Sequence, residues 1–406
     1  MVVERFVARL GVASAALFLV VLPFGHVTSI RSTSLLLTLA AATALWLARP
    51  PRDVPLLPVF LVWAAAALVS LVETSDLQAS LEAIRGEVLR SLLVFFMFYV
   101  LVTRLAAYRA FVAATALGLA VLSTLAIASF FRHGAWVFHY VPPLGDFATF
   151  TVTAMPLVVG YIALRWRKRA WLALCCMAIG ATLIAGYLTF SRGFWLALVS
   201  ALLVGAALYS KRAARASRPA AVAIAVVCVL FLALAGLAAA ERGRSIAFMS
   251  DRWPIYSAVV QKIPQNPLTG TGYGHETDKT WYERALPGKQ VFHAHNLALS
   301  YLDQMGPAGL LALAAIFAVP AFAFASALRV GPSAAAMPAV CGFALLAAVF
   351  VKNNLDHFFV KQNLWLFFAH LGIYLGQIER ENRARALASA LAKMSSISPI
   401  AEQTIS

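Results

Sequence analysis

Apolar runs of about 20 residues recur along nearly the whole chain, and short polar turns separate them. A run of that length is what an α-helix needs to cross the hydrocarbon core of a bilayer. We predict about twelve membrane-spanning helices, near residues 8–24, 32–48, 55–72, 89–103, 110–130, 148–164, 170–189, 194–209, 219–240, 298–327, 333–351 and 362–378. The pattern therefore predicts an all-α polytopic membrane protein.

The predicted spans divide the chain unevenly. Residues 1–240 hold nine spans, residues 241–297 form one long loop, residues 298–378 hold three further spans, and residues 379–406 form a tail. The long loop is the stretch densest in polar, aromatic, glycine and proline residues. Because the chemistry of membrane proteins is built where polar groups collect, the candidate site belongs in or beside this loop.

Composition agrees with this assignment and excludes two classes of protein. Hydrophobic residues make up 62% of the chain and charged residues only 12%, and the mean hydropathy is +0.81. Soluble domains carry roughly 25% charged residues, so a soluble enzyme and a disordered chain are both excluded.

The net charge of +16 raises the question of a nucleic-acid partner. More than half of the 33 Lys and Arg residues lie in alternate short turns and in the tail, which is the distribution that the positive-inside rule describes. We therefore expect membrane lipids and no nucleic acid as partners. The same distribution predicts that both termini are cytoplasmic and that the long loop faces the opposite side.

Two arginines at the predicted outer edge are candidates for anion binding. Arg192 stands between two spans and precedes Gly193, where backbone can approach a ligand. A guanidinium there either binds phosphate through its planar fork or anchors the helix to lipid headgroups. Arg252 follows Asp251, a candidate helix cap, and a helix start would reinforce an anion site. The alternative is a surface pair with Asp251 or Glu241.

The loop continues with alternating glycines, Gly270, Gly272 and Gly274. Their spacing does not fit the dinucleotide-binding fingerprint, and no βαβ unit surrounds them. It suits a tight extended turn in which backbone approaches either a substrate or a neighbouring helix. Trp281 lies beyond them and either stacks on sugar or belongs to the interfacial aromatic belt.

The loop closes with His293, His295 and Asn296, directly before a span. Two histidines two residues apart do not share a helix face, and no cysteine or patterned carboxylate accompanies them, so we expect no metal. An imidazole that titrates near neutral pH suits a general base, and the alternative for either histidine is a hydrogen-bonded structural role. We expect His293 to be structural. The cluster that holds Lys352, Asp356, His357 and Lys361 either lines the same cavity or forms a solvated turn.

The order of these elements resembles a known family. Arg-x-x-x-Tyr at 252–256, Asn-Pro-Leu-x-Gly-x-Gly-x-Gly at 266–274 and His-Asn-x-x-Leu at 295–299 follow one another in one external loop. With Ser-Arg-Gly at 191–193, they resemble the O-antigen ligase and polymerase superfamily of bacterial envelope glycosyltransferases. The resemblance covers the topology and the region from about Tyr187 to Gly309.

The resemblance implies a GT-C-like fold and glycan transfer from undecaprenyl-diphosphate carriers at the periplasmic face of the inner membrane. It places Arg192 and Arg252 at phosphate-binding positions and His295 at that of the essential histidine. Tyr256 departs from the family, which commonly has Trp there. The site residues assigned to substrate are, besides Tyr256, Gly270, Gly272, Gly274, Trp281 and Asn296.

The chain is shorter than the related protein-glycosylating enzymes, which favours a ligase. We expect an O-antigen ligase that transfers a polysaccharide from undecaprenyl diphosphate to lipid A-core, inverts the anomeric centre, and needs neither metal nor cofactor. One alternative is an O-antigen polymerase with the same chemistry. A weaker one is a transporter of the lipid-linked glycan, which would place polar residues deep in the spans rather than at their outer edge.

Overall fold

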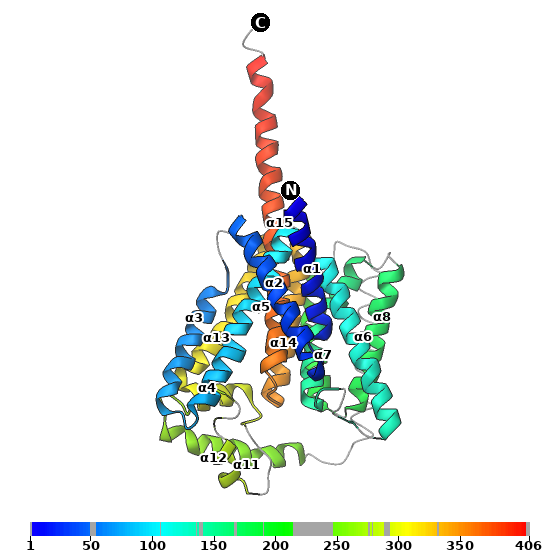
Figure 1. The fold of residues 1–406 in the computed structure, drawn as a ribbon. Helices are drawn as coiled ribbons and strands as arrows, with labels where there is room; N and C mark the ends of the chain where they lie inside the picture. The colour runs from blue at the N-terminus through cyan, green and yellow to red at the C-terminus, as the bar shows by residue number, and fades with distance from the viewer. Residues whose placement is uncertain are drawn as a thin grey trace.

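Upright helices form a bundle, and two shorter helices lie across one of its ends (Figure 1). The computed structural model describes residues 2–48, 54–105, 107–134, 136–137, 141–165, 169–189, 191–213, 247–274, 277, 279–287, 293–330 and 333–402. Within these ranges every regular element is a helix.

The first half of the described chain supplies most of the upright helices. Its elements are α1 (Val2–Val21), η1 (Gly25–Val27), α2 (Thr28–Ala48), α3 (Leu57–Val69), η2 (Ser70–Glu73), α4 (Leu77–Ala83), η3 (Ile84–Leu89), α5 (Arg90–Leu105), α6 (Tyr108–His133), α7 (Leu144–Arg165), α8 (Arg169–Leu188) and α9 (Arg192–Ala213). The remaining elements are α11 (Ala247–Lys262), η4 (Ile263–Gln265), α12 (Lys279–Ala285), α13 (Leu297–Val330), α14 (Ser333–Leu355) and α15 (Lys361–Glu402).

Eight of the described helical segments are long and apolar enough to cross a membrane. This confirms a polytopic helical membrane protein. Every predicted span except 219–240 falls on a described helix, and 219–240 lies outside the described residues. The count of twelve and the GT-C-like fold stay predictions.

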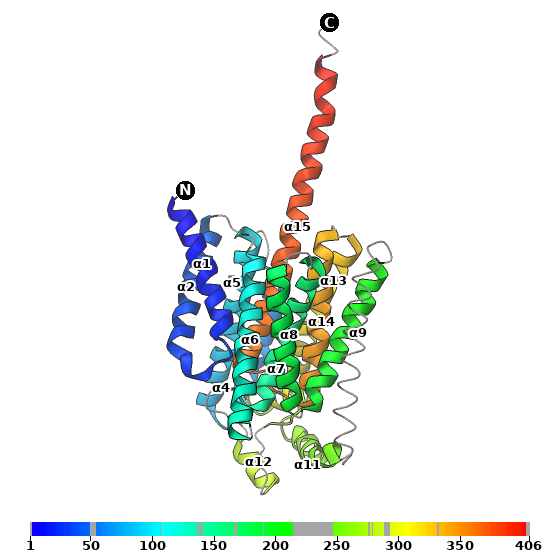
Figure 2. The same cartoon turned by 90° about the vertical axis from the view of Figure 1, so that its right-hand side faces the viewer.

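The two ends of the bundle differ. Helices α11 and α12 lie across one end, whereas the start of α1 and the last turns of α15 lie at the other, where α15 extends beyond the bundle (Figures 1 and 2). The polar loop and the two termini are therefore separated by the length of the spans, as the charge pattern predicts.

An aromatic cluster attaches the long loop to the bundle. Trp63 of α3 is fully buried, with ring centroids 6.1 Å from Tyr273 of the loop, 6.5 Å from Tyr301 of α13 and 5.9 Å from Phe368 of α15. The contact with Tyr273 is edge-on and the other two are stacked, which are both favoured arrangements of buried aromatic rings. The loop backbone near residue 273 is thereby fixed against three spans.

One predicted helix boundary is wrong. The helix near Arg252 begins at Ala247 and continues through Pro254, so Asp251 is inside α11 and does not cap it. Pro254 removes only one backbone donor, and the burial of Ile255 and Val259 against Tyr282 and Ala294 stabilises the helix around it. Arg252 consequently lies past the first turn, and a helix N-terminus contributes nothing to an anion site there.

Candidate active site

Arg252 joins three segments of the chain. Its guanidinium donates to the carbonyl of Leu355, the last residue of α14, and to the carbonyl of His295 at 3.3 Å. Its second terminal nitrogen lies 3.2 Å from Oδ1 of Asp356. The final carbonyls of a helix have no partner within that helix, so a cation is a favourable cap. Among the described side chains, the carboxylate partner of Arg252 is Asp356. Glu241 and the side chain of Asp251, the partners that the sequence suggests as an alternative, lie outside the described part of the chain.

His295 shares the carboxylate of Asp356 with Arg252. The distance from Nδ1 of His295 to Oδ1 of Asp356 is 3.0 Å. A carboxylate that accepts from Nδ1–H fixes the tautomer of a neutral imidazole and leaves Nε2 as the proton acceptor. The pair therefore has the geometry of an oriented general base.

The positive charges around Asp356 keep it ionised. Burial raises its pKa, but the hydrogen bond from His295 and the charges of Lys352 and Arg252 outweigh burial and hold the pKa of Asp356 well below its usual range. Lys352 is fully buried, with Nζ 3.5 Å from Oδ2 of Asp356 and 3.1 Å from its carbonyl oxygen. Asp356 is therefore a carboxylate throughout the neutral range.

Arg192 begins α9 beside this cluster. Ser191 caps the helix, because its Oγ accepts from the backbone N–H of Phe194 at 3.3 Å. A Cβ built on Gly193 would lie 3.4 Å from Cδ of Lys352 and 3.8 Å from Cβ of Leu355. The first turn of α9 thus packs against the last turn of α14. The backbone of Arg192, the first residue of α9, is therefore near Lys352, although the two residues are far apart in the sequence.

A buried ion pair anchors α11, which carries Arg252. Lys262, at the end of α11, lies with Nζ 3.1 Å from Oδ2 of Asp303 on α13, and both side chains are almost fully buried. Lys262 also donates to Oγ1 of Thr271 at 3.2 Å and lies over the ring of Trp281 at 4.9 Å. The tyrosine next to Trp281, Tyr282, is 3.4 Å from the same carboxylate oxygen.

The three loop glycines lie against helices. Their φ angles are +71°, +108° and +136°, in the region that favours glycine. A Cβ on Gly270 would be 2.3 Å from the carbonyl carbon of Gln304, on Gly272 2.3 Å from Oγ1 of Thr74, and on Gly274 2.9 Å from Cβ of Ala83. The glycine backbone thus approaches α13, α4 and the segment just before α4. Of the two predicted alternatives, approach to a substrate or to a neighbouring helix, the structure shows the second.

Two of the other predicted residues, Asn296 and His293, lie next to His295 in the chain and fix the backbone around it. Asn296 accepts from the backbone N–H of Leu299 at 2.9 Å, which caps α13, and donates to the carbonyl of Asn354 at 3.0 Å. His293 is buried, and its Nδ1 accepts from the N–H of His295 at 3.0 Å, in keeping with a structural role. Tyr256 is half-buried one turn after Arg252.

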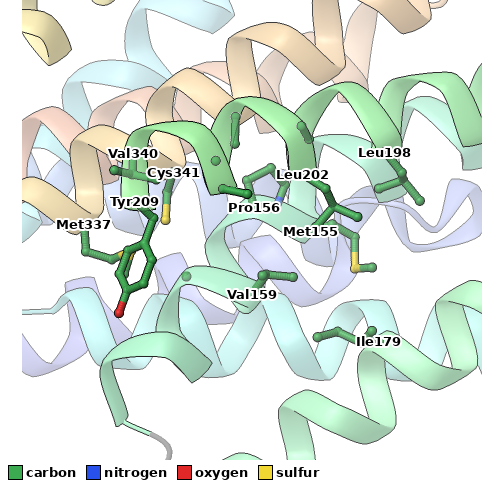
Figure 3. A pocket seen from close by; sticks show the side chains of 15 residues that line it. Met155, Pro156, Val159, Ile179, Leu198, Leu202, Tyr209, Met337, Val340 and Cys341 are labelled. Carbon is green, nitrogen blue, oxygen red and sulfur yellow. The ribbon is translucent and has the colours of Figure 1, made fainter. Parts of the chain in front are cut away.

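An apolar pocket lies along α9 (Figure 3). It runs from Leu198 to Tyr209 on α9, with Met155 and Pro156 of α7, Ile179 of α8 and Cys341 of α14 among its walls. Its lining is almost entirely hydrocarbon, which suits an aliphatic chain and no charged group.

Sequence reasoning grouped Lys352 and Asp356 without placing them, and it did not single out the pair of Lys262 and Asp303. The signal in the sequence is the spacing of Lys352 and Asp356, a lysine and a carboxylate four residues apart at the end of a span, which indicates an ion pair on one helix face. Its partners Arg252 and His295 are distant in sequence, so only the fold brings the four residues together. Within the described residues, no three His, Cys, Asp or Glu side chains gather as a metal site.

The fold and this cluster define a polytopic helical membrane protein with arginine, lysine, histidine and aspartate gathered at one end of its bundle. Residues 177–314 match the family model described as O-Antigen ligase, and this segment contains Arg192, Arg252 and His295. The predicted resemblance is confirmed over that segment. Members of the family are glycosyl-transferring ligases or polymerases. No curated protein matches the chain.

Proposed function

We propose that this protein is an O-antigen ligase, which transfers a polysaccharide from undecaprenyl diphosphate to lipid A-core at the periplasmic face of the inner membrane. The observation that supports the proposal is the convergence of Arg252, His295 and Lys352 on Asp356 at one end of the spans, where the first turn of α9, which carries Arg192, packs against the end of α14. These groups supply what the transfer needs, namely a base for the acceptor hydroxyl and positive charge for the leaving diphosphate.

In the proposed reaction, Nε2 of His295 takes the proton of the acceptor hydroxyl as its oxygen forms a bond to the anomeric carbon. The bond from that carbon to the diphosphate oxygen breaks, and the diphosphate leaves with the electron pair. Attack from the opposite face inverts the anomeric centre. Asp356 stabilises the imidazolium that forms, as carboxylates do in histidine-based catalysis.

Arg192 and Arg252 have different tasks in this scheme. Arg192 binds the diphosphate, and Lys352 and Arg252 add positive charge beside it. Arg252 also holds Asp356 against His295, because its guanidinium bonds both segments. The apolar pocket along α9 receives part of the polyprenyl chain, whose head then lies at Arg192.

The test is transfer by purified protein from carrier-linked glycan to lipid A-core, with and without EDTA. We expect product that survives EDTA. His295→Ala should lower the rate about 10²–10⁴-fold and Arg192→Ala about 10²–10³-fold. Arg284→Ala, which removes an exposed arginine of α12, is the matched control and should retain activity.

Each contrary result has a definite reading. Near-normal activity of His295→Ala would refute the base assignment, and product that requires added metal would refute metal-independent transfer. If wild-type protein extends carrier-linked chains but never modifies lipid A-core, the protein is the polymerase of the same superfamily.

A further inference from the structure

A second pocket lies beside the candidate active site, on the side of α1, α2 and α7. It has a volume of about 190 Å³, whereas a single water needs roughly 10–15 Å³. Three separate segments form it, namely the turn after α1, the residues that lead into α7, and the first turn of α15. None of these residues belongs to the loop that carries His295.

The polar groups of this pocket come from α7 and α15. Asp146 and Asn363 line it together with His26 and Gln362. Asn363 is buried, and its Nδ2 donates to Oδ1 of Asp146 at 2.8 Å and to the carbonyl of Phe358 at 3.0 Å. The carboxamide is therefore held in one orientation beside a carboxylate, which is a built arrangement and not a chance surface cluster.

The rest of the lining is apolar and rigid. Pro142, Pro143 and Phe150 present hydrocarbon to the pocket. The opposite wall includes Pro23 and Gly25, and the guanidinium of buried Arg31 lies 3.5 Å from the carbonyls of Leu22 and Phe24 on either side of Pro23. A few fixed polar groups among apolar walls are typical of a small-molecule site.

A short connection links the pocket to Asp356. Residues 356–363 run from the end of α14 into α15, and within them Phe358 donates its N–H to Asn353 while its carbonyl accepts from Asn363. The charges of Lys352 and Asp356 act on Asp146. A ligand in the pocket thus lies next to the residues that surround His295.

We propose that this pocket binds a sugar unit of one of the two glycan substrates, with Asp146 and Asn363 as its hydrogen-bonding groups. Sugar hydroxyls both donate and accept, which matches a carboxylate beside a carboxamide, and their C–H faces match the prolines and Phe150. The inference rests on the proposed glycosyl transfer and adds a saccharide site to it. Hydroxyl groups and C–H faces are common to the sugars of the acceptor and of the donor, so either substrate fits the pocket. Separate titration of the two substrates distinguishes them.

Gly25 lines the pocket and leaves room for a larger side chain. A Cβ there meets no atom within 4 Å, and its φ is not in the positive region, so a side chain at this position extends into open space. We expect Gly25→Trp to raise KM about tenfold or more for the substrate whose sugar it displaces, which equals about 1.4 kcal/mol of lost binding. Gln362→Ala removes a polar group without adding bulk and should raise the same KM.

The matched control is Ile30→Trp, which adds the same bulk at a position on α2 that is 48% exposed and does not line the pocket. Donor and acceptor are titrated separately, and each variant is checked by its melting temperature and elution volume. A rise in the acceptor KM assigns the pocket to the acceptor, and a rise in the donor KM assigns it to the donor.

The inference is overturned if folded Gly25→Trp and Gln362→Ala transfer glycan with both KM values within twofold of wild type, or if only kcat falls. Absence of transfer by wild-type protein is a different result, because it refutes the proposed function before the pocket is tested. The two failures are therefore distinguishable.

Discussion

His295 adopts a backbone conformation that few side chains tolerate. Its φ is +52°, in the left-handed region, where a non-glycine residue costs on the order of 1–3 kcal/mol. The contacts that hold it are the bond from its N–H to His293, the bond from Arg252 to its carbonyl, and its own bond to Asp356. Such strain concentrates at functional sites, which supports placing the chemistry at this residue.

Asp356→Asn tests whether the carboxylate orients the histidine. We expect kcat to fall about 10²–10⁴-fold with little change in KM, because the amide neither fixes the required tautomer nor stabilises the imidazolium. The double variant Asp356→Asn/His295→Ala should be no slower than His295→Ala alone, since residues that act as a unit are not additive. Additive losses would show instead that Asp356 acts independently of His295.

At the scale of elements, the position of Arg252 depends on how α11 docks. Lys262 and Asp303 connect the end of α11 to α13, and both side chains are almost fully buried. Removing one partner of such a pair is strongly destabilising because the other charge stays buried, whereas removing both is much less costly.

We therefore predict a coupled pair. Lys262→Met and Asp303→Leu should each lower stability by about 3–5 kcal/mol, and the double variant should lose clearly less than the sum. Thermal unfolding in detergent measures this, with Lys279→Met on α12 as a lysine control outside the pair. Full additivity would mean that the two side chains contribute separately.

The elements differ in how well the sequence predicts them. The spans follow directly from apolar runs of about 20 residues, because a helix is the structure in which a single segment satisfies all of its own backbone hydrogen bonds in lipid. The predicted start of the helix near Arg252 is wrong, because the packing of Ile255 and Val259 stabilises a helix that begins earlier, at Ala247. The motif residues Arg192, Arg252 and His295 were found from local spacing. Asp356 was only a member of an ambiguous cluster, because its role depends on partners 61 and more residues away.

At the scale of the whole molecule, the proposed chemistry requires one orientation in the membrane. The candidate site and the last turns of α15 lie at opposite ends of the bundle (Figure 1). The excess of Lys and Arg in alternate turns predicts that the α15 end is cytoplasmic and that the site faces the opposite, periplasmic side.

Two cysteine variants test the orientation in intact cells with a membrane-impermeant maleimide. Trp253, on α11, is 67% exposed, and Leu387, on α15, is 63% exposed. We expect Trp253→Cys to be labelled through a permeabilised outer membrane and Leu387→Cys to be labelled only after lysis. The chain with its four natural cysteines gives the background. If Leu387→Cys is labelled before lysis and Trp253→Cys only after it, the site faces the cytoplasm and not the periplasmic glycans. That result would refute the proposed ligase, whatever the geometry of His295 and Asp356.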